Sequence, residues 1–268
     1  MRIRWPFLRE RDDDADNETA TFESSGGTHP PKTPRVGLGR TLRVVFGPRT
    51  RLGCALLDGT AVGREPVLLM ARNEMERDEL CRRWPLAAVA LATEAGDGEG
   101  YEWPEDVETV VVHVCALGPI HPSDPDWSRD ASSTGRDLGA LGRLLEKSGR
   151  ASVHIVFSSS VLALAPGRDR GYYAGWKCLI EATLAQMAER HGRAQISVLY
   201  PGRLVASRSI ARPASLLHAT YTQMARVMAE VGESSQPRRM LLGLDTRLWL
   251  PLQGLLGAVR VLRWRLSG

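Results

Sequence analysis

Short apolar runs recur along this chain, and most are followed by a segment with the pattern of a helix. The apolar residues within each run are continuous rather than alternating, which is typical of parallel strands buried on both faces. The strand candidates are 42–46 (LRVVF), 66–72 (PVLLMAR), 86–92 (LAAVALA), 107–116 (VETVVVHVCA), 151–160 (ASVHIVFSSS), 195–202 (QISVLYPG) and the strand-like 240–244 (MLLGL). Strands that alternate with helices predict an α/β fold, a Rossmann-type doubly wound parallel sheet of about six strands.

The segments between these runs supply the helices that such a sheet needs. Residues 73–84 (NEMERDELCRRW) are charged and amphipathic, and 137–149 (DLGALGRLLEKSG) have helical spacing. Residues 178–192 (CLIEATLAQMAERHG) form a helix that Gly192 should end, and a further helix is expected around 214–232.

The chain of 268 residues fits one α/β domain with extensions. We expect a disordered leader at 1–38, because it combines an acidic run with Ser, Thr, Gly and Pro and has no apolar period. The Rossmann-type domain is expected at 39–246, and an amphipathic tail at 247–268. Charges interrupt the first residues, MRIRWPFLRERDDD, so a secretory signal is not expected and a cytoplasmic protein is.

Composition excludes several classes of function. The formal net charge is +4, an excess too small to indicate nucleic-acid binding by itself. The four cysteines have neither a CxxC pair nor a metal-ligand spacing, so we expect reduced thiols and no metal site. They are Cys54, Cys81, Cys115 and Cys178.

A glycine-bearing turn, GPRTRLG (47–53), joins the first strand to the first helix, where backbone N–H groups and the helix dipole favour an anion. Gly47 and Gly53 suit a tight turn and close helix packing, but Thr50 or Arg51 stands where a dinucleotide turn has its middle glycine. Arginine side chains could donate to a phosphate instead. The residues expected at the phosphates are Gly47, Arg49, Thr50, Arg51, Leu52 and Gly53. A plain turn with surface arginines is the alternative.

Arg72 and Asn73 follow the second strand, where an acidic residue would bind a ribose 2′-hydroxyl. No carboxylate stands there, and an arginine suits a 2′-phosphate. The sequence therefore favours NADP over NAD if a dinucleotide binds. A solvated arginine that opens a charged helix remains an equal alternative.

The stretch RGYYAGWK (170–177) places Tyr173 four residues before Lys177, in a chain with only three lysines. This spacing puts both side chains on one helix face. Ser160, at the end of the strand 151–160, could join them at the carboxyl edge of a parallel sheet. A nearby ammonium would lower the phenol pKa toward the range of proton transfer, while the serine holds the substrate oxygen. A packed tyrosine and a solvated lysine on an ordinary amphipathic helix are the alternative.

From Leu42 to Gly202 the sequence resembles a divergent, atypical member of the short-chain dehydrogenase/reductase superfamily. The resemblance is carried by GPRTRLG, LLMARN, FSSSV, YAGWK and VLYPG. It implies Ser160, Tyr173 and Lys177 as catalytic residues, with Tyr173 and Lys177 also against the cofactor.

The same resemblance extends to the nicotinamide side of the site. It implies that Pro201 and Gly202 lie beside the nicotinamide, and that Ala116, in the HVCALG that replaces the family's Asn-Asn-Ala-Gly, lines the cofactor. No asparagine follows Asn73. Ser132 or Ser133 falls nearest the helix asparagine that supports the lysine in many members.

Three functions are open on these grounds. The first is an NADP-preferring oxidoreductase that acts on a small-molecule carbonyl or secondary alcohol. The second is a non-catalytic, regulatory protein that binds NADP or NAD without turnover. A nucleotide-sugar epimerase or dehydratase is disfavoured, because only 66 residues follow Gly202 and leave little chain for a substrate lobe.

Two further features have structural interpretations. His113 and His154 lie within apolar strands, where a core histidine is the usual outcome. Residues 248–266 interleave tryptophan and leucine with arginines and could lie on an anionic membrane surface. We favour packing against a hydrophobic edge or in a homo-oligomer interface, because the tail follows the core without a linker.

Overall fold

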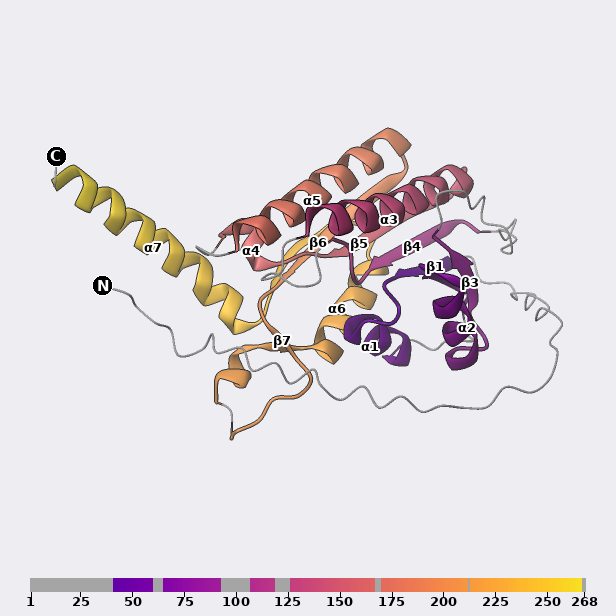
Figure 1. Cartoon of the computed structure of the whole chain (residues 1–268), viewed down its shortest axis with the longest axis horizontal. Coiled ribbons are helices and arrows are strands. Elements are labelled where there is room, and N and C mark those ends of the chain that lie inside the picture. Colours follow the sequence, from indigo (N-terminus) through magenta and orange to yellow (C-terminus); the bar gives the residue numbers. More distant parts are fainter. Residues whose placement is uncertain are drawn as a thin grey trace. The chain divides into compact units, whose positions relative to one another are not determined.

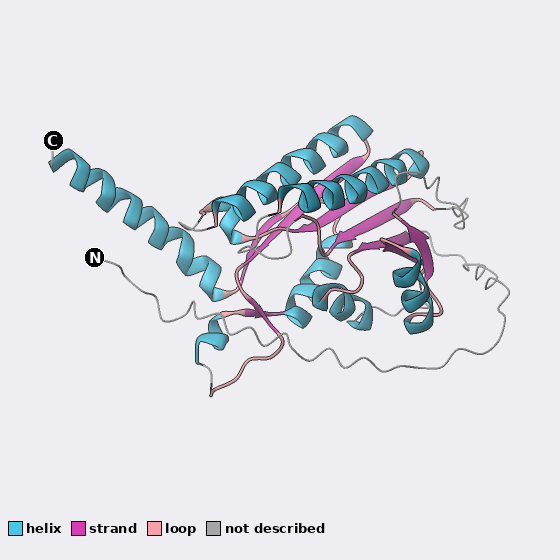
Figure 2. Cartoon of the chain, viewed as in Figure 1, coloured by secondary structure: helices cyan, strands magenta, loops and turns pink. Residues whose placement is uncertain are grey.

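The computed structural model describes residues 41–59, 65–92, 107–118, 126–166, 170–211 and 213–266, and the predicted leader at 1–38 lies outside them. Seven strands form one sheet in the order β3-β2-β1-β4-β5-β6-β9, in which every pairing is parallel (Figures 1 and 2). They are β1 (Thr41–Phe46), β2 (Val67–Ala71), β3 (Ala88–Leu91), β4 (Thr109–Val114), β5 (Ser152–Ser158), β6 (Ala194–Pro201) and β9 (Arg239–Leu242). The order reverses between β1 and β4, the place where such sheets bind ligands. The predicted fold class is confirmed.

Helices cover both faces of the sheet (Figure 1). On one face α3 (Trp127–Ser148) and α5 (Gly171–His191) pack on one hydrophobic core. On the other, α1 (Arg51–Gly59), α2 (Glu74–Arg83) and α6 (Tyr221–Gly232) pack on a second. The short α4 (Val161–Leu164) follows β5, and α7 (Leu244–Leu266) follows β9.

Local chemistry explains where several helices begin and end. The Asn73 side chain accepts from the Glu76 N–H and starts α2, which has acidic residues in its first turn and arginines in its last. Gly192 ends α5 with a φ of 73°, a left-handed conformation that glycine adopts without strain. The predicted stop at this glycine is confirmed.

The segment 213–232 differs from the single helix expected around 214–232. Residues Pro213–Leu217 form a short 3₁₀ turn, and β8 (Ala219–Thr220) then pairs with β7 (Leu204–Val205). The helix starts only at Tyr221, because Thr220 and Gln223 form a capping box: the Thr220 hydroxyl accepts from the Gln223 N–H (3.1 Å), and the Gln223 side chain accepts from the Thr220 N–H (3.2 Å).

The two strand histidines lie in the core, as predicted. His113 is 1% exposed, and burial lowers its pKa to about 3, so it is neutral at physiological pH. His154 Nε2 lies 2.8 Å from Ser197 Oγ.

Across the described ranges, no helix is long and apolar enough to cross a membrane, and no cluster of His, Cys, Asp and Glu could hold a metal ion.

Candidate active site at the carboxyl edge of the sheet

Ser160 and Tyr173 meet just beyond the carboxyl end of β5. Ser160 is buried and caps α4, where its Oγ accepts from the Leu162 N–H at 3.3 Å. Tyr173 lies in the first turn of α5, close enough to Ser160 for the serine side chain to act on the pKa of its phenol. The two hydroxyls that the sequence predicted to converge therefore lie near each other.

Lys177 lies one turn after Tyr173 on the same helix face and is only 5% exposed. Its Nζ donates to the Leu117 carbonyl oxygen at 2.9 Å. The same nitrogen lies 5.5 Å from the centre of the Tyr173 ring and 5.3 Å from that of Phe157. The predicted pair of phenol and ammonium is thus assembled, with the cation over the ring rather than at the hydroxyl.

The pKa of Tyr173 differs from the expectation drawn from the sequence. Burial raises it above 10, although the Ser160 hydrogen bond and the Arg170 charge oppose that rise. The expectation of a lowered phenol pKa is therefore wrong for this arrangement. The pKa rises because desolvation of the phenol outweighs the opposing effects of Ser160 and Arg170. The Tyr173 phenol therefore carries its proton at neutral pH.

Burial also lowers the pKa of Lys177 to about 8, against an opposing effect of the Glu181 carboxylate. Glu181 in turn accepts hydrogen bonds from the Ser159 hydroxyl and, at 2.8 Å, from the Tyr200 hydroxyl. The lysine is therefore supported by a backbone carbonyl and by a carboxylate one turn further along α5. Sequence reasoning placed Ser132 or Ser133 nearest to a supporting position and did not predict the bond to the Leu117 carbonyl.

The glycine turn packs tightly against the end of β4. Gly47 has a φ of 71°, and a Cβ there would lie 2.8 Å from the Ala116 Cβ. A Cβ at Gly53 would lie 2.3 Å from the Gly47 carbonyl oxygen. The glycine turn and Ala116 thus pack together at the switch point of the sheet and leave no space for larger side chains at Gly47 and Gly53.

Thr50 closes this turn. Its Oγ1 donates to the Gly47 carbonyl at 2.8 Å and accepts from the Gly53 N–H at 3.0 Å, so it caps the start of α1. One N–H donor of the helix N-terminus is therefore used within the turn. Leu52 is buried, and the Arg49 guanidinium pairs with Glu79 at 3.1 Å.

Arg72 and Asn73 have partners at the end of β2. The Arg72 guanidinium donates to Asp137 of α3 at 3.0 Å. Asp137 is 4% exposed, and burial raises its pKa although the arginine opposes that shift. Asn73 caps α2. An arginine held by a buried carboxylate from another helix was not visible in the sequence.

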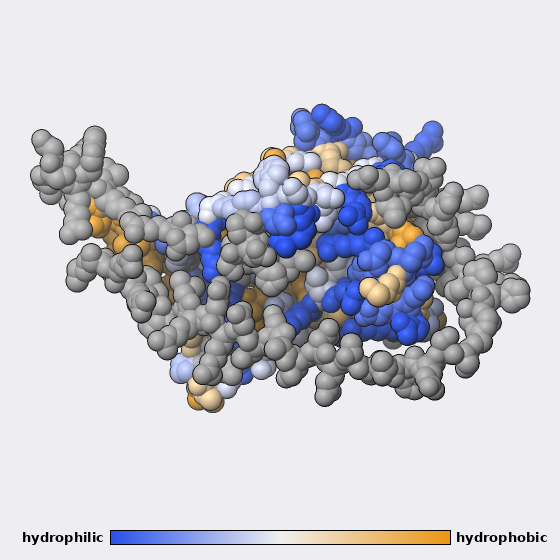
Figure 3. All heavy atoms as spheres, in the orientation of Figure 1, coloured by the Kyte–Doolittle hydropathy of each residue, from blue (hydrophilic) through white to orange (hydrophobic). Residues whose placement is uncertain are grey.

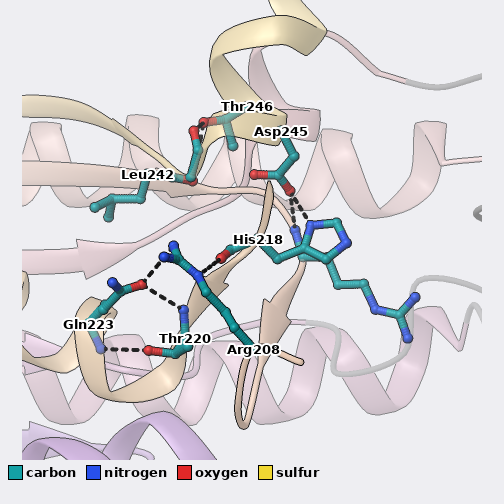
Figure 4. Close-up of polar contacts among 9 residues, drawn as sticks. Arg208, His218, Thr220, Gln223, Leu242, Asp245 and Thr246 are labelled. Atoms are coloured by element: carbon teal, nitrogen blue, oxygen red, sulfur yellow. Dashed lines mark hydrogen bonds and ion pairs between the residues drawn. The ribbon is translucent and has the colours of Figure 1, made fainter. Parts of the chain in front are cut away.

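Pro201 and Gly202 lie beside the start of α7. A Cβ at Gly202 would lie 2.1 Å from Asp245 Oδ2, which also accepts from the Arg203 N–H (3.1 Å) and lies 2.8 Å from His218 Nδ1 (Figure 4). Sequence reasoning missed Asp245 and His218, because 43 residues separate Gly202 from the carboxylate. The one local feature that could have pointed to Asp245 is its place two residues after Gly243, just beyond a predicted strand.

Solved structures of similar fold are numerous. A short-chain type dehydrogenase/reductase from Mycobacterium ulcerans has a TM-score of 0.56 at 17% identity, over 78% of this chain and 90% of that one. A 3-ketoacyl-(acyl-carrier-protein) reductase from Brucella melitensis, complexed with NADH, has a TM-score of 0.58 at 13% identity, and the match covers 77% of this chain and 98% of that one. A short chain dehydrogenase from Burkholderia cenocepacia in complex with NADP has a TM-score of 0.56 at 16% identity, and the match covers 85% of this chain and 97% of that one.

The fold is that of the short-chain dehydrogenases/reductases. No protein-family model matches the chain, and no curated protein matches its sequence. The likeness therefore lies in the three-dimensional arrangement, with low sequence identity throughout.

Within the short-chain dehydrogenase/reductase fold, the arrangement at β5 and α5 has a defined chemical capacity. Ser160 and Tyr173 can both donate to one oxygen atom at the sheet edge, and Lys177 provides a positive charge behind the phenol ring. The arrangement suits transfer of a proton to an oxygen that gains negative charge.

Proposed function

We propose that this protein is a divergent member of the short-chain dehydrogenases/reductases and an NAD(P)-dependent oxidoreductase that reduces a carbonyl or oxidises a secondary alcohol. The observation that carries the proposal is the buried Lys177 one turn after Tyr173, with its Nζ 5.5 Å from the centre of the phenol ring and with Ser160 nearby at the carboxyl end of β5. An ordinary amphipathic helix would leave Lys177 in solvent, whereas here the lysine is buried.

Each of the three residues has a role in this reaction. Ser160 orients the substrate oxygen by a hydrogen bond, and Tyr173 donates its proton to that oxygen during reduction. With a pKa raised above 10 by burial, the Tyr173 phenol carries its proton at pH 7, as the acid in this step must. Lys177 stabilises the phenolate that remains. A nicotinamide supplies the hydride when it is bound.

The turn at the switch point supports a dinucleotide cofactor. Gly47 and Gly53 form the tight turn between β1 and α1, and Arg49 and Arg51 lie within the same turn. The neighbours from Brucella melitensis and Burkholderia cenocepacia were solved with NADH and NADP. Pro201 and Gly202 would lie on the nicotinamide side.

NADP is the preferred cofactor in this proposal. No carboxylate stands at positions 72 and 73, and Arg72 is held at the end of β2 by Asp137. A fixed guanidinium can bind a 2′-phosphate without first being ordered. The pairing with Asp137 would then orient Arg72.

A titration of the full chain with NADPH and NADH, followed by nicotinamide fluorescence and thermal shift, tests cofactor binding. We expect NADPH to bind more tightly than NADH. Equal affinities would contradict the preference, and no binding of either would contradict a dinucleotide-dependent function.

Carbonyl-dependent oxidation of NADPH tests the catalytic assignment. We expect Tyr173→Phe to lower turnover at least about 100-fold, because general acid catalysis contributes about that much, while NADPH binding is retained. Tyr172→Phe is the matched control: Tyr172 donates to Asp130 at 2.9 Å and not to the site, so turnover should change less than about twofold. Equal activity of Tyr173→Phe and wild type would refute the role of the phenol.

A non-catalytic dinucleotide-binding protein is the second candidate. It is favoured by Lys177, whose Nζ donates to the Leu117 carbonyl. NADPH binding without oxidation across a broad panel of carbonyl compounds and alcohols would support this candidate over the enzyme.

A further inference from the structure

A groove with three arginines lies beside α6, β8 and the first turn of α7. Its volume is about 330 Å³. Apolar residues form its wall, among them Val227 and Leu244, and no aspartate or glutamate lines it. The arginines are Arg208, Arg226 and Arg247. Such a groove suits a ligand with negative charge and an apolar part.

The charges of these arginines are only weakly compensated. Arg208 donates to the His218 carbonyl (3.0 Å) and to the Gln223 side chain (3.1 Å), which are both neutral (Figure 4). Arg226 pairs with Glu230 at 3.2 Å, but both side chains are more than half exposed, and such pairs are weak. Arg247 is exposed and has no ion pair within the part of the chain described above. The groove therefore retains positive charge.

An apolar stripe continues from this groove along α7. Leu244, Leu248, Leu255 and Val259 are 53%, 59%, 63% and 48% exposed. Their spacing of four, seven and four residues places them on one helix face. Leu244 also lines the groove, so the two surfaces are continuous. In Figure 3 the described part of α7 is mostly in the hydrophobic colours.

The charge of this segment identifies the kind of surface that it fits. Residues 244–268 contain four arginines and one acidic residue, Asp245, which lies 2.8 Å from His218 Nδ1. A second copy of the chain would bring the same positive charge to the stripe. An anionic lipid surface instead offers both acyl chains for the leucines and phosphates for the arginines.

We propose that the arginine groove and the apolar stripe of α7 together dock on the surface of an anionic lipid bilayer. A lipid phosphate sits among Arg208, Arg226 and Arg247, and the stripe enters the boundary between headgroups and acyl chains. The helix lies on the bilayer, since it is not apolar enough to cross one. Docking does not depend on the proposed reaction.

Flotation of the full chain with lipid vesicles tests this proposal. Vesicles of phosphatidylglycerol and phosphatidylcholine should bind the protein at least tenfold more tightly than vesicles of phosphatidylcholine alone, and 0.5 M NaCl should weaken binding, because each arginine near an anionic surface contributes a salt-screened attraction. Arg226→Gln and Arg247→Gln should each lower affinity about fivefold. Leu248→Ser and Leu255→Ser should each lower it about tenfold or more, because each removes buried apolar area.

Matched controls lie on α2. Arg82→Gln and Met75→Ser change an exposed arginine and a 72% exposed methionine outside the proposed surface, and should leave vesicle binding unchanged. Thermal melts of all variants check that each is folded. If the control variants bind vesicles as poorly as the α7 variants, the assignment of this surface is wrong.

Three other outcomes would overturn the proposal. One is equal binding to neutral and anionic vesicles. Another is binding of inorganic phosphate that depends on Arg247, without binding to anionic vesicles, which would make the groove a site for soluble anions. The third is self-association in sedimentation velocity that Leu248→Ser abolishes, again without vesicle binding, which would make the stripe an interface between copies of the chain.

Discussion

At the scale of single residues, Lys177 shows how strongly burial acts in this site. The side chain is 5% exposed, and its Nζ bonds to a neutral carbonyl rather than to a carboxylate. Burial lowers the pKa from 10.5 to about 8, although Glu181 raises it. The folded protein therefore holds a proton on this lysine less firmly than the unfolded chain does.

The stability of the protein should depend on Lys177 and on pH. Between about pH 8 and pH 10.5 the unfolded chain binds the proton and the folded protein does not, so the free energy of unfolding should rise with pH in this window. Below pH 8 the full cost of burying the charge remains. Lys177→Met removes this cost and should increase stability at pH 7 by about 1–3 kcal/mol.

Urea denaturation at pH 7, 8, 9 and 10 measures this effect. Lys147→Met is the control, because Lys147 is exposed in the last turn of α3. A wild-type pH slope that persists in Lys177→Met would show that another group causes it.

At the scale of elements, the turn before α1 depends on glycine at two positions. The backbone atoms of Gly47 and Pro48 lie within 3 Å of the position that a Cβ at Gly53 would occupy. Backbone atoms of a capped turn cannot move aside as a flexible side chain does. Gly53 therefore stands in the first turn of a helix, where its own propensity is unfavourable.

Gly53→Ala should destabilise the protein by about 2 kcal/mol, because overpacking outweighs the gain of about 1 kcal/mol in helix propensity. Gly59, at the end of the same helix, is the control: no atom of another described segment lies within 4 Å of a Cβ there, so Gly59→Ala should be neutral or stabilising. Thermal and urea unfolding of both variants give the comparison. Equal stability of the two variants would mean that the turn can relax.

At the scale of the whole molecule, Arg43 connects distant parts of the chain. It lies within β1 and is only 6% exposed. Its guanidinium bonds to Glu65, which precedes β2, and at 3.0 Å to Glu233, which follows α6. Arg43 and Glu233, which are 190 positions apart in the sequence, are thereby joined near the amino-terminal ends of the strands.

Replacing both carboxylates should destabilise the protein more than replacing the arginine. Glu65→Gln with Glu233→Gln leaves a buried guanidinium without compensating charge. We expect the free energy of unfolding to fall by about 2 kcal/mol. This is less than for a fully buried ion pair, because both glutamates are partly exposed. Arg43→Met leaves two carboxylates that water can solvate and should cost about 1 kcal/mol or less.

Urea unfolding of these variants measures the difference. Glu230→Gln breaks an exposed pair on α6 and should change stability by less than about 0.5 kcal/mol. The opposite order, with Arg43→Met the more damaging change, would show that packing of the arginine stem matters more than its charge.

Local patterns in the amino-acid sequence predict the order of the elements and one shared helix face. Continuous apolar runs indicate buried parallel strands, and the seven strands of the larger sheet lie within or beside the predicted runs. The spacing of Tyr173 and Lys177 predicts a shared face, because helical geometry is local. Gly192 ends α5 for the same reason. These features depend on residues a few positions apart, so a pattern in the sequence is sufficient.

The partners of these side chains, in contrast, depend on how the whole chain folds. Asp137 holds Arg72, the Leu117 carbonyl binds Lys177, and Asp245 packs on Gly202. Each partner is more than 40 residues away and is brought near by the order of strands and helices around the sheet. The pKa of Tyr173 is higher than expected because desolvation is set by all the atoms packed around a group, and no spacing of residues along the chain records that burial.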